Sequence, residues 1–152
     1  MRRTAVISLV LIIADQATKL LADGLLPGRP SRPVIDGFFY LTLVYNQGIA
    51  FGFFPRYSRL FIFLSLVTIA AIAFFYRKVF SQGKAYQAAG GLILGGAIAN
   101  LVDRIIYGHV VDFLDFRLGA YRWPAFNLAD SAICVGVGLL LVLAWSTRKK
   151  AS

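Results

Sequence analysis

The acid–base chemistry open to this chain of 152 residues rests on few side chains. It contains one histidine, His109, and one cysteine, Cys134, while every acidic residue is an aspartate. The aspartates are Asp15, Asp23, Asp36, Asp103, Asp112, Asp115 and Asp130. A Ser-His-Asp triad would have to use His109, a zinc site with several histidines is impossible, and one cysteine forms no internal disulfide. Carboxyl chemistry is therefore the leading hypothesis.

Asp112 and Asp130 are the strongest candidates for catalysis. Asp112 stands among large apolar residues, which is unusual for a merely solvated acid, and Asp130 follows Asn127 by three residues. Helix capping is an open alternative for Asn127 and Asp130, because Asn is a good N-cap and an acid favours the positive helix end. Two carboxyl groups at one site fit peptide hydrolysis, in which one activates water and the other, protonated, polarises the carbonyl. Burial and repulsion keep such a pair singly protonated.

Ionisable residues inside membrane helices are costly, and this makes them functional candidates. Asp15 and Lys19 lie four residues apart on one helix face,. They form a mutual ion pair, with Lys19 extending outward to the headgroups, or they have a direct catalytic role, and both interpretations can hold if the pair braces the site. Asn100 and Arg104 also share a helix face. Arg104 either holds a carboxylate or ends its helix at the headgroups, whereas Asn100 favours a role in the site.

Composition predicts the elements that position these residues. Hydrophobic residues make up 59% of the chain and charged residues 15%, against about 25% charged in ordinary globular proteins. Four apolar runs, approximately 4–22, 58–76, 85–106 and 127–146, are each close to the roughly 20 residues of a membrane-spanning helix,. A cleavable signal peptide is an alternative for the first run, but its apolar character resumes after Lys19. We expect an all-α integral membrane protein with one domain, residues 1–152.

Basic residues predict the orientation. The net charge of +9 does not indicate nucleic acid, because lysine and arginine lie at the ends of apolar runs,. With both termini cytoplasmic, the inner segments are the start, residues 77–84 and the tail after residue 147, all basic without an acid. The outer segments, about 23–57 and 107–126, are longer and mix arginines with aspartates. Both long loops are therefore expected outside.

The outer loops predict a small extracytoplasmic β-sheet. Pro27, Pro30 and Pro33 exclude helix in the first loop,. Residues 38–45 are aromatic and β-branched and end at a turn signal, so they indicate a strand, and residues 110–118 also indicate one,. We expect the first strand to cover the site at the outer leaflet. In the third apolar run, small residues at four-residue spacing predict close helix packing. This topology brings Asp112 and Asp130 to the same outer edge.

The chain resembles the lipoprotein signal peptidases (signal peptidase II) over essentially its whole length, in five motifs in order. These are Asp15-Gln16-x-x-Lys19, Asn46-x-Gly48-x-x-Phe51, Gly95-Gly96-x-x-x-Asn100-x-x-Asp103-Arg104, Val110-Val111-Asp112-Phe113 and Phe126-Asn127-x-Ala129-Asp130. The resemblance implies that Asp112 and Asp130 are the catalytic pair. It also implies residues that shape the site or hold the substrate, namely Asp15, Lys19, Asn46, Gly48, Asn100, Arg104 and Asn127.

The resemblance further implies the reaction and its setting. The substrate would be a prolipoprotein that carries diacylglyceryl on a cysteine, cut just before that cysteine in a bacterial cytoplasmic (inner) membrane. No metal or organic cofactor is implied. Globomycin-type cyclic peptides would inhibit by placing a hydroxyl between the aspartates. A monomer in contact with membrane lipid is expected, because one chain can build the site.

Two rival functions remain open from the residues alone. A small four-helix proton-coupled transporter would use a membrane-embedded acid as proton carrier. The absence of glutamate and the clustering of acids near one edge argue against it. A non-catalytic assembly protein would explain the small-residue helix face but not the convergent aspartates.

Overall fold

The computed structural model describes residues 1–28, 31–47 and 58–151, and this part of the chain contains four long helices. They are α1 (Arg2–Leu25), α2 (Ser58–Val79), α3 (Lys84–Tyr107) and α4 (Leu128–Ala151), with a 3₁₀ turn, Phe80–Gln82, between α2 and α3. All four are long and apolar enough to cross a membrane, which confirms the predicted class. Each helix ends later than expected, because backbone hydrogen bonding continues into residues that follow the apolar run,.

Helix α3 lies at the centre and packs against the other three helices. Gly95 faces α1, where a Cβ atom would lie 2.9 Å from Cα of Ser8. Gly96 faces α4, where a Cβ atom would lie 2.5 Å from the carbonyl oxygen of Ala129. These contacts confirm that small residues let the helices approach closely. The close approach brings polar side chains of α1, α3 and α4 within bonding distance.

The strands form a four-stranded antiparallel array in the order β1-β2-β3-β4. They are β1 (Arg32–Ile35), β2 (Phe39–Asn46), β3 (Val110–Leu118) and β4 (Tyr121–Arg122). The two strands expected from the sequence are confirmed as β2 and β3, whereas β1 and β4 were not predicted. Pro33 lies within β1 at the edge of the sheet, where a missing N–H group removes no internal ladder bond,.

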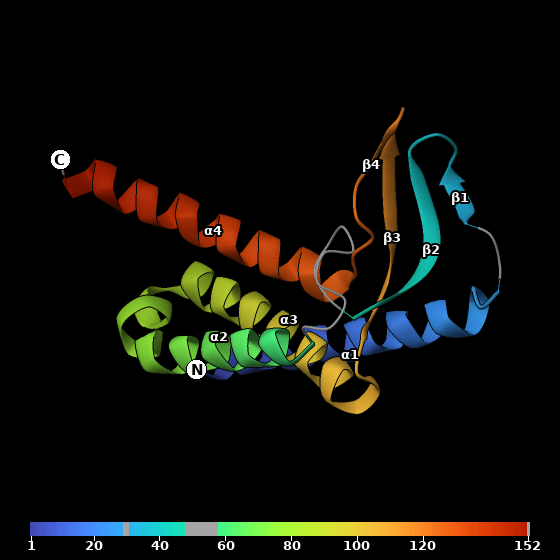
Figure 1. The fold of residues 1–152 in the computed structure, drawn as a ribbon. Coiled ribbons are helices and arrows are strands. Elements are labelled where there is room, and N and C mark those ends of the chain that lie inside the picture. The colour runs from blue at the N-terminus through green and yellow to red at the C-terminus, as the bar shows by residue number, and fades with distance from the viewer. Residues whose placement is uncertain (29–30, 48–57, 152) are drawn as a thin grey trace.

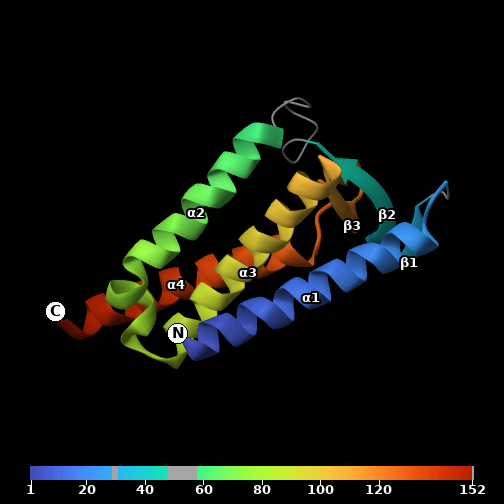
Figure 2. The same ribbon diagram turned by 90° about the horizontal axis from the view of Figure 1, so that it is seen from below.

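The sheet stands at the end of the helices opposite to both chain termini (Figures 1 and 2). Phe113 of β3 packs with Ala22 of α1 and with Leu26, so the sheet rests on the end of α1. Gly108 ends α3 with φ +73°, and its N–H bonds to the carbonyl oxygen of Arg104. This left-handed residue turns the chain directly into β3. In Figure 1, α4 begins beside the sheet and diverges from the other helices toward its C-terminus.

Candidate active site

A return segment places the start of α4 beside β3. Backbone hydrogen bonds join Phe126 to β3: the N–H groups of Phe113 and Leu114 donate to its carbonyl oxygen, and its own N–H donates to Leu114. Asn127 follows at once and precedes the first residue of α4. The residue order alone did not specify this pairing. The pairing of Phe126 with β3 brings Asp130 close to Asp112.

Asn127 contacts both candidate carboxyl groups. Its side-chain nitrogen Nδ2 donates to Oδ1 of Asp112 at 2.7 Å, and its Oδ1 accepts from the backbone N–H of Asp130 at 2.9 Å. The second contact is the predicted N-cap bond, and in return Oδ2 of Asp130 accepts from the backbone N–H of Asn127 at 3.4 Å,. Capping and site-building are therefore carried out by the same residue.

Two further asparagines complete the shell of donors. Asn46, at the end of β2, donates from Nδ2 to Oδ2 of Asp112 at 2.8 Å. Asn100 of α3 donates from Nδ2 to Oδ1 of Asp130 at 2.7 Å. Thus β2, α3 and the residue before α4 place amide groups around the two carboxyl groups, which β3 and α4 carry. Asp112 is 1% exposed and Asp130 is only partly buried, so the pair lies at the edge of the packed interior.

The environment of Asp112 favours its protonated form. Burial is the largest cause, the charge of Asp130 adds to it, and together they raise the pKa of Asp112 to about 7. Hydrogen bonds from Asn46 and Asn127 act in the opposite direction. A carboxyl group that holds its proton near neutral pH beside a second carboxyl group is what general acid–base hydrolysis requires.

A cavity of about 590 Å³ opens onto both carboxyl groups. Asn46, Asp112 and Asp130 contribute its polar lining, while Phe61 and Val135 are among its apolar walls. Arg104 also lines it. A site with one polar edge and apolar walls suits a substrate that remains in contact with lipid.

Lys19 differs from its expected outward position. It is 3% exposed and turns inward, with Nζ 2.7 Å from Oδ2 of Asp15, 2.7 Å from Oδ2 of Asp103 and 2.9 Å from Oδ1 of Asn100. The predicted ion pair is present, but extension of Lys19 to the headgroups was wrong, because buried acceptors surround its ammonium. Asp15 also accepts from the backbone N–H of Ala129 at 2.8 Å, so this cluster ties α1 to the start of α4.

The remaining expected site residues have mixed outcomes. Arg104 donates from Nη1 to the carbonyl oxygen of Asn100 at 3.3 Å and lies over the ring of Phe61 at 5.1 Å. In the described part of the chain it forms no ion pair with a carboxylate, and its role as a group that holds one stays a prediction. Gly48 lies outside the described residues.

Sequence reasoning gave no role to Asp103, although its position inside a membrane helix was a usable signal. Asp115 likewise has partners that the sequence did not indicate. It is fully buried, and Arg117 and Arg122 donate to it at 2.6 and 2.8 Å, as does Thr42 at 2.7 Å. Burial alone would raise the pKa of Asp115, but these hydrogen bonds outweigh it and lower the pKa to about 2.

Comparisons with known proteins find similar sequences that cover nearly the whole chain. A family model described as signal peptidase (SPase) II matches residues 7–146. The lipoprotein signal peptidase of Halothermothrix orenii is 42% identical over 144 residues, which cover 95% of this chain and 96% of the relative. The lipoprotein signal peptidase of Geobacter sulfurreducens is 48% identical over 134 residues, covering 86% and 84%.

Two solved structures, both described as bacterial membrane enzymes, share the fold. The first has a TM-score of 0.90 and 28% identity, and the match covers 100% of this chain and 93% of that structure. The second has a TM-score of 0.80 and 30% identity, covering 95% and 93%.

Proposed function

The chain belongs to the signal peptidase II family, and we propose that it cuts its substrates with the carboxyl pair Asp112 and Asp130. Membership makes it a peptidase that removes signal peptides from prolipoproteins, and it argues against the transporter and the assembly protein. The observation that carries the catalytic assignment is that Asn127 donates to both carboxyl groups, from its side chain to Asp112 and from its backbone N–H to Asp130, at one cavity.

The pair works with one shared proton. The ionised carboxylate accepts a proton from water while the water oxygen attacks the scissile carbonyl carbon, and the protonated carboxyl donates a hydrogen bond to the carbonyl oxygen. When the C–N bond breaks, the nitrogen takes a proton from a carboxyl group and leaves as the amine. The pair then again holds one proton. The raised pKa of Asp112 supports this state near neutral pH.

The substrate is a prolipoprotein that carries diacylglyceryl on a cysteine, and cleavage occurs just before that cysteine. The apolar walls of the cavity, among them Phe61 and Val135, support a lipid-bearing substrate. A lipidated cysteine stays at the bilayer surface, which is the depth where membrane-spanning α3 ends and α4 begins. Globomycin-type cyclic peptides would bind in the same cavity and compete with the substrate.

The chain is a multi-pass membrane protein, and we place both termini in the cytoplasm. The basic, acid-free inner segments support this orientation,. The sheet lies at the end of the helices opposite to both termini (Figures 1 and 2). With this orientation, the sheet and the carboxyl pair lie at the outer leaflet of a bacterial cytoplasmic membrane. One chain supplies every residue of the proposed site, which supports a monomer.

The test uses the purified chain in detergent and a diacylglyceryl-modified prolipoprotein. Asp112→Asn and Asp130→Asn are each expected to abolish cleavage while the helical circular-dichroism signal and thermal midpoint persist. Asp115→Asn is the matched control, a buried aspartate of the same strand, and it should still cleave. Full activity in either of the first two variants would remove that residue from the mechanism.

A further inference from the structure

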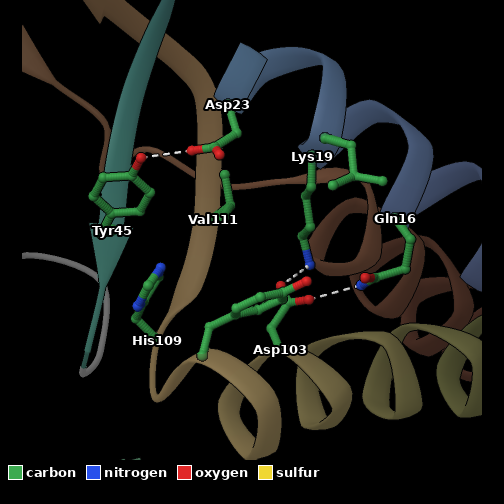
Figure 3. A pocket seen from close by; sticks show the side chains of 9 residues that line it. Gln16, Lys19, Asp23, Tyr45, Asp103, His109 and Val111 are labelled. Atoms are coloured by element: carbon green, nitrogen blue, oxygen red, sulfur yellow. Dashed lines mark hydrogen bonds and ion pairs between the residues drawn. The ribbon is translucent and has the colours of Figure 1, made fainter. Parts of the chain in front are cut away.

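The ammonium group of Lys19 lies against three side-chain oxygen atoms, from Asp15, Asp103 and Asn100. Asp15 and Asp103 each form an ion pair with it at 2.7 Å, and Oδ1 of Asn100 accepts a hydrogen bond from it at 2.9 Å. Figure 3 shows Lys19 and Gln16 reaching Asp103 together from α1. The bond from Gln16 Nε2 to Asp103 Oδ1 is 2.7 Å long. A lysine ammonium group only donates hydrogen bonds, so whatever faces it must be an acceptor.

This property fixes the orientation of the Asn100 amide. Its carbonyl oxygen must face Lys19, and its NH₂ group then faces Asp130, where Nδ2 lies 2.7 Å from Oδ1. Asn127 reinforces this orientation by donating to the same oxygen of Asn100 at 3.2 Å. In the flipped orientation the NH₂ group would face the ammonium and the amide oxygen would face the carboxylate. Unsatisfied polar groups of this kind are costly where the surroundings are buried.

Asp103 completes the support of Lys19. Burial of an ammonium group is costly unless it is paired and fully hydrogen-bonded. Without Asp103 the buried ammonium group would keep Asp15 as its one ion-pair partner, and Asp15 also accepts from the backbone N–H of Ala129. With Asp103 present, Lys19 is held between α1 and α3 by two ion pairs, and it donates its hydrogen bond to Asn100.

Asp103 acts from outside the substrate cavity. It borders a separate pocket of about 230 Å³, together with Gln16, Lys19 and Val111 (Figure 3). Val111 and Asp112 are neighbours in β3, and successive strand residues point to opposite faces,. Asp112 lines the larger cavity and Val111 lines this pocket, so the two spaces lie on opposite faces of β3.

We propose that Asp103 is a positioning residue of the peptidase reaction: through Lys19 it fixes the amide of Asn100 and thereby the carboxyl group of Asp130. This inference rests on the proposed catalytic role of Asp130. It assigns to the ionic cluster an effect on the chemical step, beyond its contribution to holding the helices together.

The experiment measures kcat and KM separately with the full chain in detergent and a diacylglyceryl-modified prolipoprotein. Asp103→Asn should lower kcat by about tenfold or more, with KM changed by less than about twofold. Lys19→Arg, which keeps a group that only donates, should retain more kcat than Lys19→Met. Asp115→Asn is the control for loss of a buried charge, and it should leave kcat near wild type.

The outcomes separate this inference from the proposed function. If Asp130→Asn is inactive but Asp103→Asn keeps wild-type kcat and only its thermal midpoint falls, Asp103 is merely structural and the inference is overturned. If Asp130→Asn cleaves normally, the proposed function and the inference both fail. Should Asp103→Asn not fold, Gln16→Met tests the same chain of contacts, since it removes the bond to Asp103 without changing a charge. A wild-type kcat in that variant and equal kcat in the two Lys19 variants would overturn the inference.

Discussion

The side-chain nitrogen of Asn127 lies 2.7 Å from Oδ1 of Asp112 and donates to it. The same side chain caps α4 by accepting from the backbone N–H of Asp130. One amide therefore sets the distance between a strand and a helix terminus, and with it the relation between two carboxyl groups. A helix cap that is also part of the site explains why the sequence alone left the two interpretations open.

The two roles of Asn127 can be separated by substitution. Serine caps helices about as well as asparagine, but its hydroxyl is too short to contact Asp112 as well. Asn127→Ser is therefore expected to keep the helical circular-dichroism signal and the cap of α4, to lower the thermal midpoint through the lost buried bonds, and to lose about a hundredfold in kcat,. Steady-state kinetics and thermal melting of the purified variant check this. Wild-type kcat would show that Asn127 is only a cap.

The pKa of Asp112 predicts the pH dependence of cleavage. Because burial and the charge of Asp130 raise it to about 7, the pair keeps its shared proton below that pH. Cleavage should decline as the pH rises above about 7, with an apparent value that belongs to the pair. The folded state also binds this proton more tightly than the unfolded state. The contribution of Asp112 to the free energy of unfolding therefore decreases as the pH rises from about 4 to about 7. Activity that stays constant well above that range would contradict the assignment.

The close approach of α3 and α4 at Gly96 is expected to be required for activity. A Cβ atom there would lie 2.5 Å from the carbonyl oxygen of Ala129, next to Asp130. Gly96→Ala should destabilise the protein by about 1–3 kcal/mol and lower cleavage, because α4 must shift. Gly138→Ala in α4 is the matched control, since a Cβ atom there meets nothing within 4 Å. Thermal melting and cleavage assays of both variants test this prediction. Equal thermal midpoints and equal cleavage rates in the two variants would contradict it.

The buried carboxylate of Asp115 is predicted to contribute to stability and not to chemistry. Asp115→Asn removes charge-assisted bonds from Arg117 and Arg122 and should cost about 2 kcal/mol,. Because hydrogen bonds lower the pKa of Asp115 to about 2, its contribution is present above about pH 4 and is lost as the pH falls toward 2,. Unfolding measured against pH tests both statements. A wild-type stability profile in the variant would refute them.

Cys134 gives a chemical probe of the cavity. It is exposed, it lines the cavity that holds the carboxyl pair, and it lies one helical turn after Asp130,. Labelling with a methanethiosulfonate reagent should block cleavage, because the adduct occupies space needed by the substrate. Cys134→Ala should resist the reagent, which shows that the effect comes from this thiol. Labelled protein that cleaves at the unlabelled rate would place the substrate elsewhere.

The sequence determined the membrane class, the helices and the two main strands. Apolar runs of bilayer length leave few alternatives to a helix, since backbone groups in lipid must be bonded within their own segment. The residue types also limited the chemistry to carboxyl groups. Asp112 and Asp130 were identifiable because each combines an ionisable group with an apolar or capping context that solvation does not explain.

Only the tertiary structure decided how the polar residues are connected. Whether Lys19 extends outward or turns inward depends on acceptors from α3, which lie more than 80 positions away in the chain. The backbone hydrogen bonds between Phe126 and β3, which set Asn127 in place, likewise join two segments whose pairing only the folded chain defines. Such contacts depend on side-chain direction and on the close helix approach at Gly95 and Gly96. Local sequence patterns carry neither, because they report which face a residue occupies and not which partner it meets there.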